Sequence, residues 1–178
     1  MDPPHVDRSA TNLDVEIRFA GELDADAISL LLGDLGYSIE AARILEKLAA
    51  LRHSPADRVW VAEAPSGVLG DAGEALAGLL SFHAIPLLHT PGNLGRITSL
   101  VVHPQLRGKG IGRRLVGVAE CFARESQCER LELTSGEHRH DAHRFYLALG
   151  FALRSARFVK TLARAGECPT PFRAAGPP

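Results

Sequence analysis

Apolar residues in the first third of the chain follow two different periods. In "VEIRF" (residues 15–19) every second residue is apolar, which predicts a strand with one buried face. From Asp24 to about Leu32, and again after Ser38, apolar residues recur every three or four positions, as they do on one face of a helix. Asp24 and Ser38 stand just ahead of these two patterns, where N-cap residues are expected. The chain therefore begins with a strand followed by two helices.

Strand patterns dominate the middle of the chain. "RVWVAEA" (58–64) and "ALAGLLSFHAI" (75–85) are apolar segments joined by a turn-rich connection, which predicts an antiparallel pair. "LGRITSLVV" (94–102) is a further strand, and it ends at His103-Pro104 because a proline cannot donate to a strand ladder. These segments indicate a central sheet.

Helices and strands alternate in the last third. Ile111, Leu115 and Val118 share one face of a predicted helix that runs to about Glu125. A further strand, a short helix and one or two closing strands are predicted at residues 130–135, 141–150 and about 152–162. The whole pattern predicts an α/β fold, with a mixed but mostly antiparallel sheet of six to seven strands flanked by about four helices.

Length and composition agree with one domain. A chain of 178 residues that is 46% hydrophobic can bury a core of its own. Residues 1–13 and 166–178 are rich in proline and small residues and show no periodicity, so we expect both ends to be flexible. The predicted domain spans residues 14–165.

Charge and cysteine usage exclude several classes of protein. Lysine and arginine number 20 against 21 acidic residues, so a net charge of −1 gives no basic field to attract nucleic acid. The sequence has no run of 18 apolar residues that would span a membrane. Its three cysteines form no C-x-x-C pair, which favours a reducing compartment. We therefore expect a cytoplasmic protein that binds neither nucleic acid nor membrane.

The segment "QLRGKGIGRR" (105–114) combines glycines and cations between a predicted strand and a predicted helix. Backbone N–H groups at a helix N-terminus have no internal partner and carry the positive end of the helix dipole. Glycines let a phosphate approach that backbone closely, and cations pair with phosphate oxygens. The residues concerned are Gly108, Gly110 and Gly112, with Arg107, Lys109, Arg113 and Arg114. The segment predicts a site for a phosphate-bearing cofactor.

Spacing excludes two common nucleotide loops. A P-loop requires G-x-x-x-x-G-K-[ST], but here the lysine lies between glycines and no Ser or Thr follows it. The dinucleotide fingerprint requires G-x-G-x-x-G, whereas Gly108, Gly110 and Gly112 give G-x-G-x-G.

The segment "LVVHPQLRGKGIGRRLV" resembles motif A of the GNAT superfamily of acyl-CoA-dependent N-acyltransferases, with Gln105, Gly108 and Gly110 at the family's positions. The resemblance implies a GNAT-like fold in which the loop amides hold the pyrophosphate of acetyl-CoA. The preceding strand would pair with the pantetheine arm, and an N–H near Val101 or Val102 would hold the acetyl carbonyl. The residues implied to bind acetyl-CoA are Leu100, Val101, Val102, Arg107, Gly108, Lys109, Gly110, Ile111, Gly112 and Arg113.

"AHRFYLALGF" (142–151) is similar to motif B of the same family, with Ala142, Tyr146, Gly150 and Phe151 at the matching positions. The resemblance implies that Tyr146 is the general acid that protonates the departing thiolate of coenzyme A. The family often has an asparagine three residues before Ala142, and this chain has Arg139 there.

The neighbouring histidines do not predict a metal. His138, His140 and His143 lie close together, but no second segment supplies ligands at a suitable spacing. We expect acetyl-CoA as cosubstrate and no metal.

The base that deprotonates the acceptor amine is the missing part of the site. Relatives often use a Glu on the strand before motif A, but "LGRITSLVV" contains no carboxylate. His83, Glu132, Glu137 and a water chain are the alternatives. We predict Glu132 as the base, because alternation turns it away from Leu131 and Leu133.

The acceptor is the least defined part of the prediction. The resemblance implies that the loop between the first two helices grips it, and there Asp34 and Tyr37 would receive a cationic amine. The acceptor would be a small-molecule amine or a protein amine, and the family favours a homodimer. An alternative is a module that binds or senses acyl-CoA without catalysis, because the strand before motif A carries no carboxylate.

Overall fold

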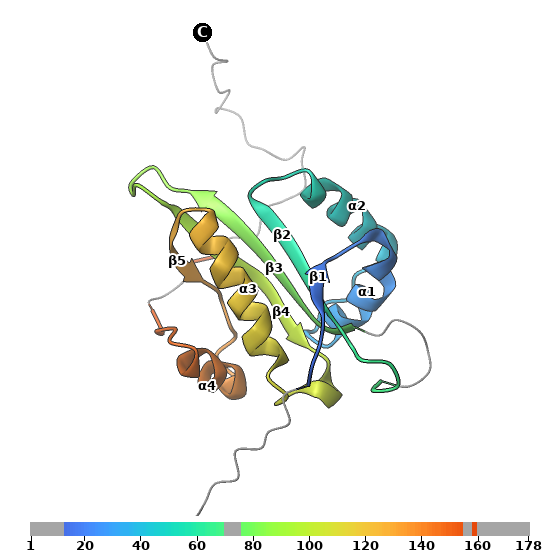
Figure 1. Ribbon diagram of the computed structural model, residues 1–178. Helices are drawn as coiled ribbons and strands as arrows, with labels where there is room; N and C mark the ends of the chain where they lie inside the picture. Colours follow the sequence, from blue (N-terminus) through green and yellow to red (C-terminus); the bar gives the residue numbers. More distant parts are fainter. Residues whose placement is uncertain (1–12, 70–75, 155–157, 160–178) are drawn as a thin grey trace, which may run out of the picture. The chain divides into compact units, whose positions relative to one another are not determined.

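A five-stranded sheet forms the centre of the computed structural model, which describes residues 13–69, 76–154 and 158–159 (Figure 1). Its strands are β1 (Ile17–Phe19), β2 (Asp57–Glu63), β3 (Leu76–Pro86), β4 (Asn93–Val102) and β5 (Cys128–Glu132). They lie in chain order, with β1 to β4 antiparallel and β5 parallel to β4. The parallel pair requires a crossover connection, which a helix provides.

Helices cover both faces of this sheet. The short 3-10 helix η1 (Glu22–Asp24) leads into α1 (Ala25–Gly33) and α2 (Ala41–Arg52), which lie on one face. A second 3-10 helix, η2 (Pro104–Leu106), precedes α3 (Ile111–Glu125), the crossover helix on the other face (Figure 1). No helix in the described ranges is long and apolar enough to cross a membrane.

The chain divides into two compact units, residues 1–139 and 140–178. The first contains the sheet with α1, α2 and α3. The second contains α4 (His140–Ala148), which is described by itself.

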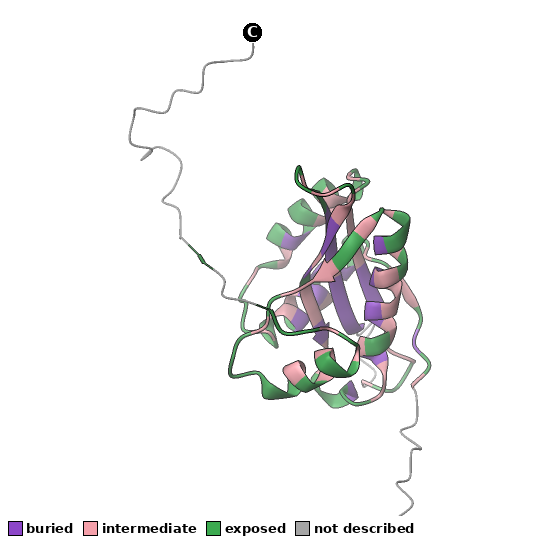
Figure 2. Cartoon of the chain, turned by 90° about the vertical axis from the view of Figure 1, so that its left-hand side faces the viewer, coloured by how far each residue is buried: buried purple, intermediate pink, exposed green. Residues whose placement is uncertain are grey.

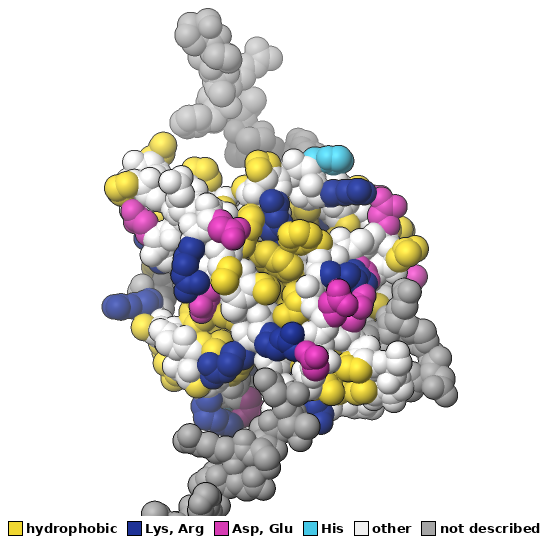
Figure 3. All heavy atoms as spheres, in the orientation of Figure 1, with side chains coloured by type: hydrophobic (Ala, Val, Ile, Leu, Met, Phe, Trp, Pro, Cys, Tyr) yellow, Lys and Arg dark blue, Asp and Glu magenta, His cyan; other side chains and the backbone are white. Residues whose placement is uncertain are grey.

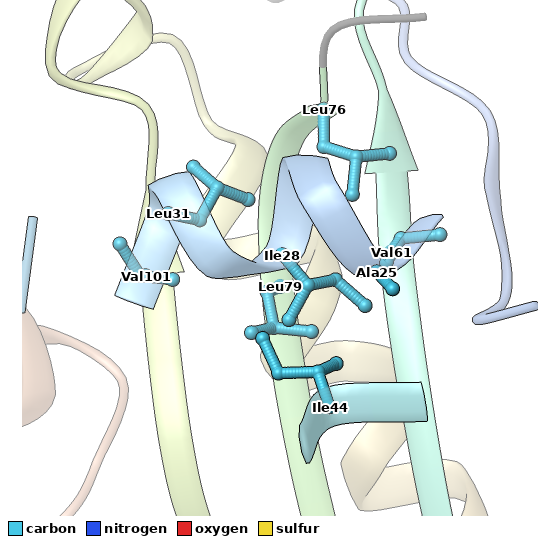
Figure 4. Close-up of a cluster of buried hydrophobic side chains, with 8 residues drawn as sticks. All are labelled: Ala25, Ile28, Leu31, Ile44, Val61, Leu76, Leu79 and Val101. Carbon is cyan, nitrogen blue, oxygen red and sulfur yellow. The ribbon is translucent and has the colours of Figure 1, made fainter. Parts of the chain in front are cut away.

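Strand alternation assigns the core residues to the two faces. Val61, Leu79 and Val101, which are neighbours across β2, β3 and β4, point toward α1 and α2 (Figure 4). From the helices, Ile28, Leu31 and Ile44 point back toward them. Burial of each such side chain contributes about 1.5–3 kcal/mol. This cluster fixes α1 and α2 against one end of the sheet.

The opposite face is packed by α3. Gly78 lies where an added Cβ would come within 2.9 Å of Leu115, so the helix approaches the backbone of β3 closely. Next to it, Phe82 meets Phe122 edge to face at 5.4 Å between ring centroids, and Trp60 meets Phe122 at 5.7 Å. The buried positions accordingly gather on the central strands (Figure 2).

A buried ion pair connects β1 to η1. The Asp24 carboxylate, only 4% exposed, accepts two hydrogen bonds from the Arg18 guanidinium, at 2.7 and 2.8 Å, and one from the Gly21 N–H at 2.6 Å. Arg18 also pairs with Glu63 of β2 at 2.5 Å. Burial raises the pKa of Asp24, but the hydrogen bonds from Arg18 and Gly21 outweigh it, so the net pKa lies below the ordinary value.

The expected fold class is confirmed, with corrections at the helix starts. Asp24 makes no capping hydrogen bond to α1 and instead turns back to Gly21 and Arg18, because an arginine lies within reach. Ser38 does not cap α2, which has Glu40 at its N-cap position. Asp24 thus occupies the predicted N-cap position of α1 without capping the helix, and the prediction that Ser38 caps α2 was wrong.

The number of strands also differs from the prediction. The described residues form five strands, whereas six to seven were expected. At the expected closing strands, residues 152–154 and 158–159 are not in a strand, and 155–157 and 160–162 lie outside the described residues. The ends expected to be flexible, 1–13 and 166–178, also lie outside them, except for residue 13.

Asp24→Asn tests the buried ion pair. The amide cannot neutralise Arg18, so the free energy of unfolding should fall by about 1–3 kcal/mol at pH 7, as measured by urea denaturation. The difference should shrink as pH falls below about 4, because the lowered pKa makes the carboxylate stabilising only while it is ionised. Arg43→Ala, which removes an exposed pair with Glu46, is the control and should cost less than about 0.5 kcal/mol. Equal losses for both variants would contradict the role of Asp24.

Candidate functional site

The glycine-rich loop adopts backbone angles that favour glycine. Gly108 has φ = 79° and Gly110 has φ = 81°, both in the left-handed region. A side chain there costs about 1–2 kcal/mol per residue. Gly110 is also the N-cap residue of α3, so the second turn of the loop leads directly into the helix.

The loop presents a row of backbone donors. In the described part of the chain, the N–H groups of residues 108 to 113 donate to no backbone carbonyl, and the first bond into α3 comes from Arg114 to Gly110 at 3.1 Å. The space outside Gly108 is open, since an added Cβ would find no atom within 4 Å. Free amides, open space and the positive end of a 15-residue helix together make an anion site.

The four cations of the loop have different surroundings. Arg107 donates from Nε to the carbonyl of Val102 at 3.2 Å, which holds it beside the end of β4. Arg114 pairs with Asp14 at 3.1 Å and is therefore engaged elsewhere. Within the described ranges, Lys109 and Arg113 have no ion-pair partner. Figure 3 shows basic side chains around the N-terminal end of α3.

The strand that leads into this loop has one unpaired edge. β4 pairs with β3 as far as Val102, but its register with β5 runs only from Asn93 to Arg96. Beyond Arg96, the edge of β4 on the side of β5 has no paired strand in the described sheet. Backbone groups on such an edge can bind an extended ligand. Leu100, Val101 and Val102, which the resemblance implies to bind the pantetheine arm, lie on this stretch of β4.

A β-bulge interrupts β4 on the same stretch. Ser99 faces Ser81 and Ile97 faces Phe82, so Thr98 is the extra residue between them. The bulge brings the exposed Thr98 onto the face of the sheet that carries Ser81 and His83, where the Thr98 hydroxyl lies within hydrogen-bonding distance of both side chains.

Four polar side chains form a hydrogen-bonded chain across this face. Asp57 Oδ1 lies 2.6 Å from His83 Nδ1, and His83 Nε2 lies 3.1 Å from the Thr98 hydroxyl. The Thr98 hydroxyl in turn lies 2.6 Å from that of Ser81. Burial raises the pKa of Asp57, but the hydrogen bonds from Ser54 and His83 lower it by more. The net pKa therefore lies below the ordinary value. The sequence indicated His83 as a candidate base but gave no sign of its partners.

Glu132, predicted as the base, is engaged in an ion pair. It lies at the last register position of β4 and β5, where its carboxylate accepts a hydrogen bond from Arg96. This pairing follows from strand register, which the sequence does not display.

The predicted acceptor residues lie in the connection from α1 to α2. Asp34 is the C-cap residue of α1, and Tyr37 is 58% exposed. Ser29 fastens this connection by donating to the carbonyl of Ile39 at 2.6 Å. No hydrogen bond in the described structure joins Asp34 to Tyr37.

Tyr146, the predicted general acid, lies within α4 in the second unit. Its ring packs edge to face against Phe145 and Phe151, at 5.3 and 5.8 Å between centroids. The Phe151 N–H donates to the Tyr146 carbonyl at 3.1 Å, and Gly150 takes φ = 88° to allow this turn. The sequence "YLALGF" therefore folds back on itself and fixes the ring of Tyr146.

A cavity of about 870 Å³ opens where the end of α2 meets β1 and β2. Its wall includes the basic side chains of Arg52, His53 and Arg58 and the acidic side chains of Glu22 and Asp57. Through Asp57, the cavity borders the polar chain described above. No local sequence pattern indicates this cavity, because its residues come from separate segments.

Comparison with known proteins gives one consistent result. The model of the acetyltransferase (GNAT) family matches residues 31–151. The aminoalkylphosphonate N-acetyltransferase of Salmonella typhimurium is 41% identical over 87 residues, which are 49% of this chain and 56% of that protein. The match thus spans little more than half the length of that relative.

Two solved structures resemble the whole fold. A transcriptional regulator from Bacillus halodurans has a TM-score of 0.72 and 26% identity, with 84% of this chain and all of that chain covered. An acetyltransferase from Trypanosoma brucei has a TM-score of 0.68 and 25% identity, over the same shares of both chains.

Gly108→Ala tests the anion site. The Cβ would occupy the open space in front of the loop amides and strain the left-handed backbone, so acetyl-CoA should bind at least about tenfold more weakly by calorimetry. Gly67→Ala is a matched control, because Gly67 has φ = 78° and equally open surroundings, but lies outside the loop. Equal affinities of the two variants would contradict the site.

Proposed function

Because the chain belongs to the acetyltransferase (GNAT) family, we propose that it is an enzyme that transfers an acetyl group from acetyl-CoA directly to a primary amine. One observation carries the proposal: the unpaired edge of β4 leads directly into the glycine loop at the N-terminus of α3. An edge strand followed by an anion site suits a ligand with an extended arm and a pyrophosphate.

The donor would bind along these two elements. The amides of residues 108–113 would hold the pyrophosphate, with Arg107, Lys109 and Arg113 as its counter-charges. The backbone of Leu100 to Val102 would pair with the pantetheine arm. An N–H near Val101 or Val102 would stabilise the oxyanion that forms on the acetyl carbonyl.

Transfer requires three proton movements. The acceptor ammonium must first lose a proton, since only the neutral amine has a lone pair for attack on the thioester carbon. As the new C–N bond forms, the nitrogen releases a second proton to solvent; the C–S bond breaks, and coenzyme A leaves as a thiolate. Tyr146 would donate its phenolic proton to that thiolate and recover one from solvent.

For the acceptor, we propose a small amine that carries an anionic group. The relative at 41% identity is an aminoalkylphosphonate N-acetyltransferase, and the wall of the cavity beside α2, which also carries Glu22 and Asp57, offers Arg52, His53 and Arg58 as partners for an anionic group. Asp34 and Tyr37, in the connection from α1 to α2, do not line this cavity.

The proposal extends to the setting of the enzyme. A cytoplasmic location is supported by the free thiols of Cys121 and Cys128, and a homodimer by the family resemblance.

An acceptor panel tests this function. Release of the coenzyme A thiol should be compared for 2-aminoethylphosphonate, ethylamine and a lysine peptide. We expect kcat/KM to be at least about tenfold higher for the phosphonate than for ethylamine, because the arginines of the cavity would bind its anionic group. Arg52→Gln should reduce this preference, at little structural cost because Arg52 is largely exposed and its ion pair with Glu22, at 3.9 Å, is a surface pair.

The outcomes separate the alternatives. Similar rates for all amines would contradict the anionic acceptor. Acetyl-CoA binding without thiol release on any amine would indicate the non-catalytic binding module instead.

Tyr146→Phe tests the general acid. The variant keeps the ring contacts with Phe145 and Phe151 but has no proton to donate, so kcat should fall by about 10²-fold with unchanged acetyl-CoA affinity. An unchanged melting temperature serves as the internal control. A variant with wild-type kcat across the pH range would exclude Tyr146 as the acid.

A further inference from the structure

The polar chain of Asp57, His83, Thr98 and Ser81 has a defined direction. Asp57, whose lowered pKa keeps it ionised at neutral pH, can only accept a hydrogen bond, so His83 carries its proton on Nδ1. The lone pair of a neutral imidazole then lies on Nε2 and accepts from the Thr98 hydroxyl. The Thr98 oxygen accepts from Ser81. In every hydrogen bond of this polar chain, the donor therefore lies on the Ser81 side and the acceptor on the Asp57 side.

The exposed end of this chain lies on the strand proposed to hold the thioester. Thr98 is the bulge residue of β4, two positions after the last pairing with β5 and two before Leu100. Its side chain is exposed, and His83 and Asp57 are 29% and 22% exposed. A proton from an amine at this edge therefore has a short route to His83.

We propose that His83 accepts the proton of the acceptor amine through the Thr98 hydroxyl, with Asp57 as the positioning residue. This proposal rests on the proposed function. The ammonium gives a proton to the Thr98 oxygen, and the hydroxyl proton passes to His83 Nε2. The products are a neutral amine, which attacks the thioester, and an imidazolium paired with the Asp57 carboxylate. The imidazolium returns its proton to solvent after the transfer.

The surroundings of His83 favour it over Glu132. Asp57 on β2 faces it from one side, and from the other side Arg96 on β4 is its register partner. Arg96 is neutralised by Glu132 of β5, so that carboxylate is already engaged. Arg52 and His53 of α2 line the cavity that Asp57 borders. Among side chains, imidazole has an ordinary pKa near neutrality, whereas a carboxylate is a weak base toward an ammonium.

His83→Gln tests this assignment through the pH dependence of kcat/KM. In the wild type, kcat/KM should rise with pH, because a base accepts a proton only while it is unprotonated. The variant should lose this pH dependence and about 10²-fold of kcat/KM at pH 7. Asp57→Asn should also change this pH dependence, because the imidazolium loses its carboxylate. His89→Gln is the matched control, because His89 is an exposed histidine that does not belong to the hydrogen-bonded polar chain. This variant should match the wild type.

A second measurement separates proton transfer from a structural effect. With acceptor amines of decreasing basicity, the loss caused by His83→Gln should diminish, because such amines are already neutral at pH 7. Misfolding would reduce the rate equally for all amines. Thr98→Val, at an exposed position, should give the same pattern as His83→Gln with wild-type acetyl-CoA affinity.

The results distinguish this proposal from the proposed function. Turnover by the wild type with an unchanged pH profile in His83→Gln would overturn the role of His83 alone. If Glu132→Gln, and not His83→Gln, loses the rise of kcat/KM with pH, Glu132 accepts the proton, and the role of His83 is overturned. Absence of turnover by the wild type on every amine would overturn the acetyltransferase itself, and the role of His83 with it.

Discussion

The hydrogen bonds between β3 and β4 hold the parts of the site in place. β4 is paired with β3 along its whole length but with β5 only from Asn93 to Arg96. The one-sided pairing leaves a rigid strand with a row of exposed backbone groups, which a strand paired on both sides would not have. The glycine loop begins where this strand ends, and the polar chain crosses it at Thr98. The proposed donor site and the polar chain proposed to accept the proton thus share one element, β4.

The two faces of the sheet have separate tasks. On the face of α3, Gly78 and the ring of Phe82 pack the helix closely against the sheet, which fixes the direction of its dipole. On the other face, α1 and α2 cover Val61 and Val101, and beyond them the same face carries His83 and its partners. One face of the sheet therefore carries both core residues and, a few residues further along, the candidate catalytic residues. This follows because alternate residues of a strand lie on the same face.

Local patterns allowed the elements and the donor loop to be predicted, but not the contacts between distant segments. The period of Ile111 and Leu115 and the spacing of Gly108 and Gly110 are properties of short segments, so the helix and the glycine loop could be predicted. The left-handed angles of the two glycines are a finding of the structure. Asp24 occupies the predicted N-cap position, but its carboxylate binds Arg18 and Gly21, which the pattern does not show. The partners of Glu132 and His83 depend on strand register and on the bulge in β4. These are set by the packing of the whole sheet.

The left-handed glycines of the loop have a kinetic consequence. Gly108 and Gly110 acquire their angles when the protein folds, so little conformational entropy remains to be lost when a ligand arrives. A preformed loop of this kind lets encounter proceed without a slow rearrangement. Differences in affinity between phosphate-bearing ligands would then arise chiefly from how long each one stays bound. The loop would discriminate by residence time, while its two glycines keep the rate of capture nearly the same for all of them.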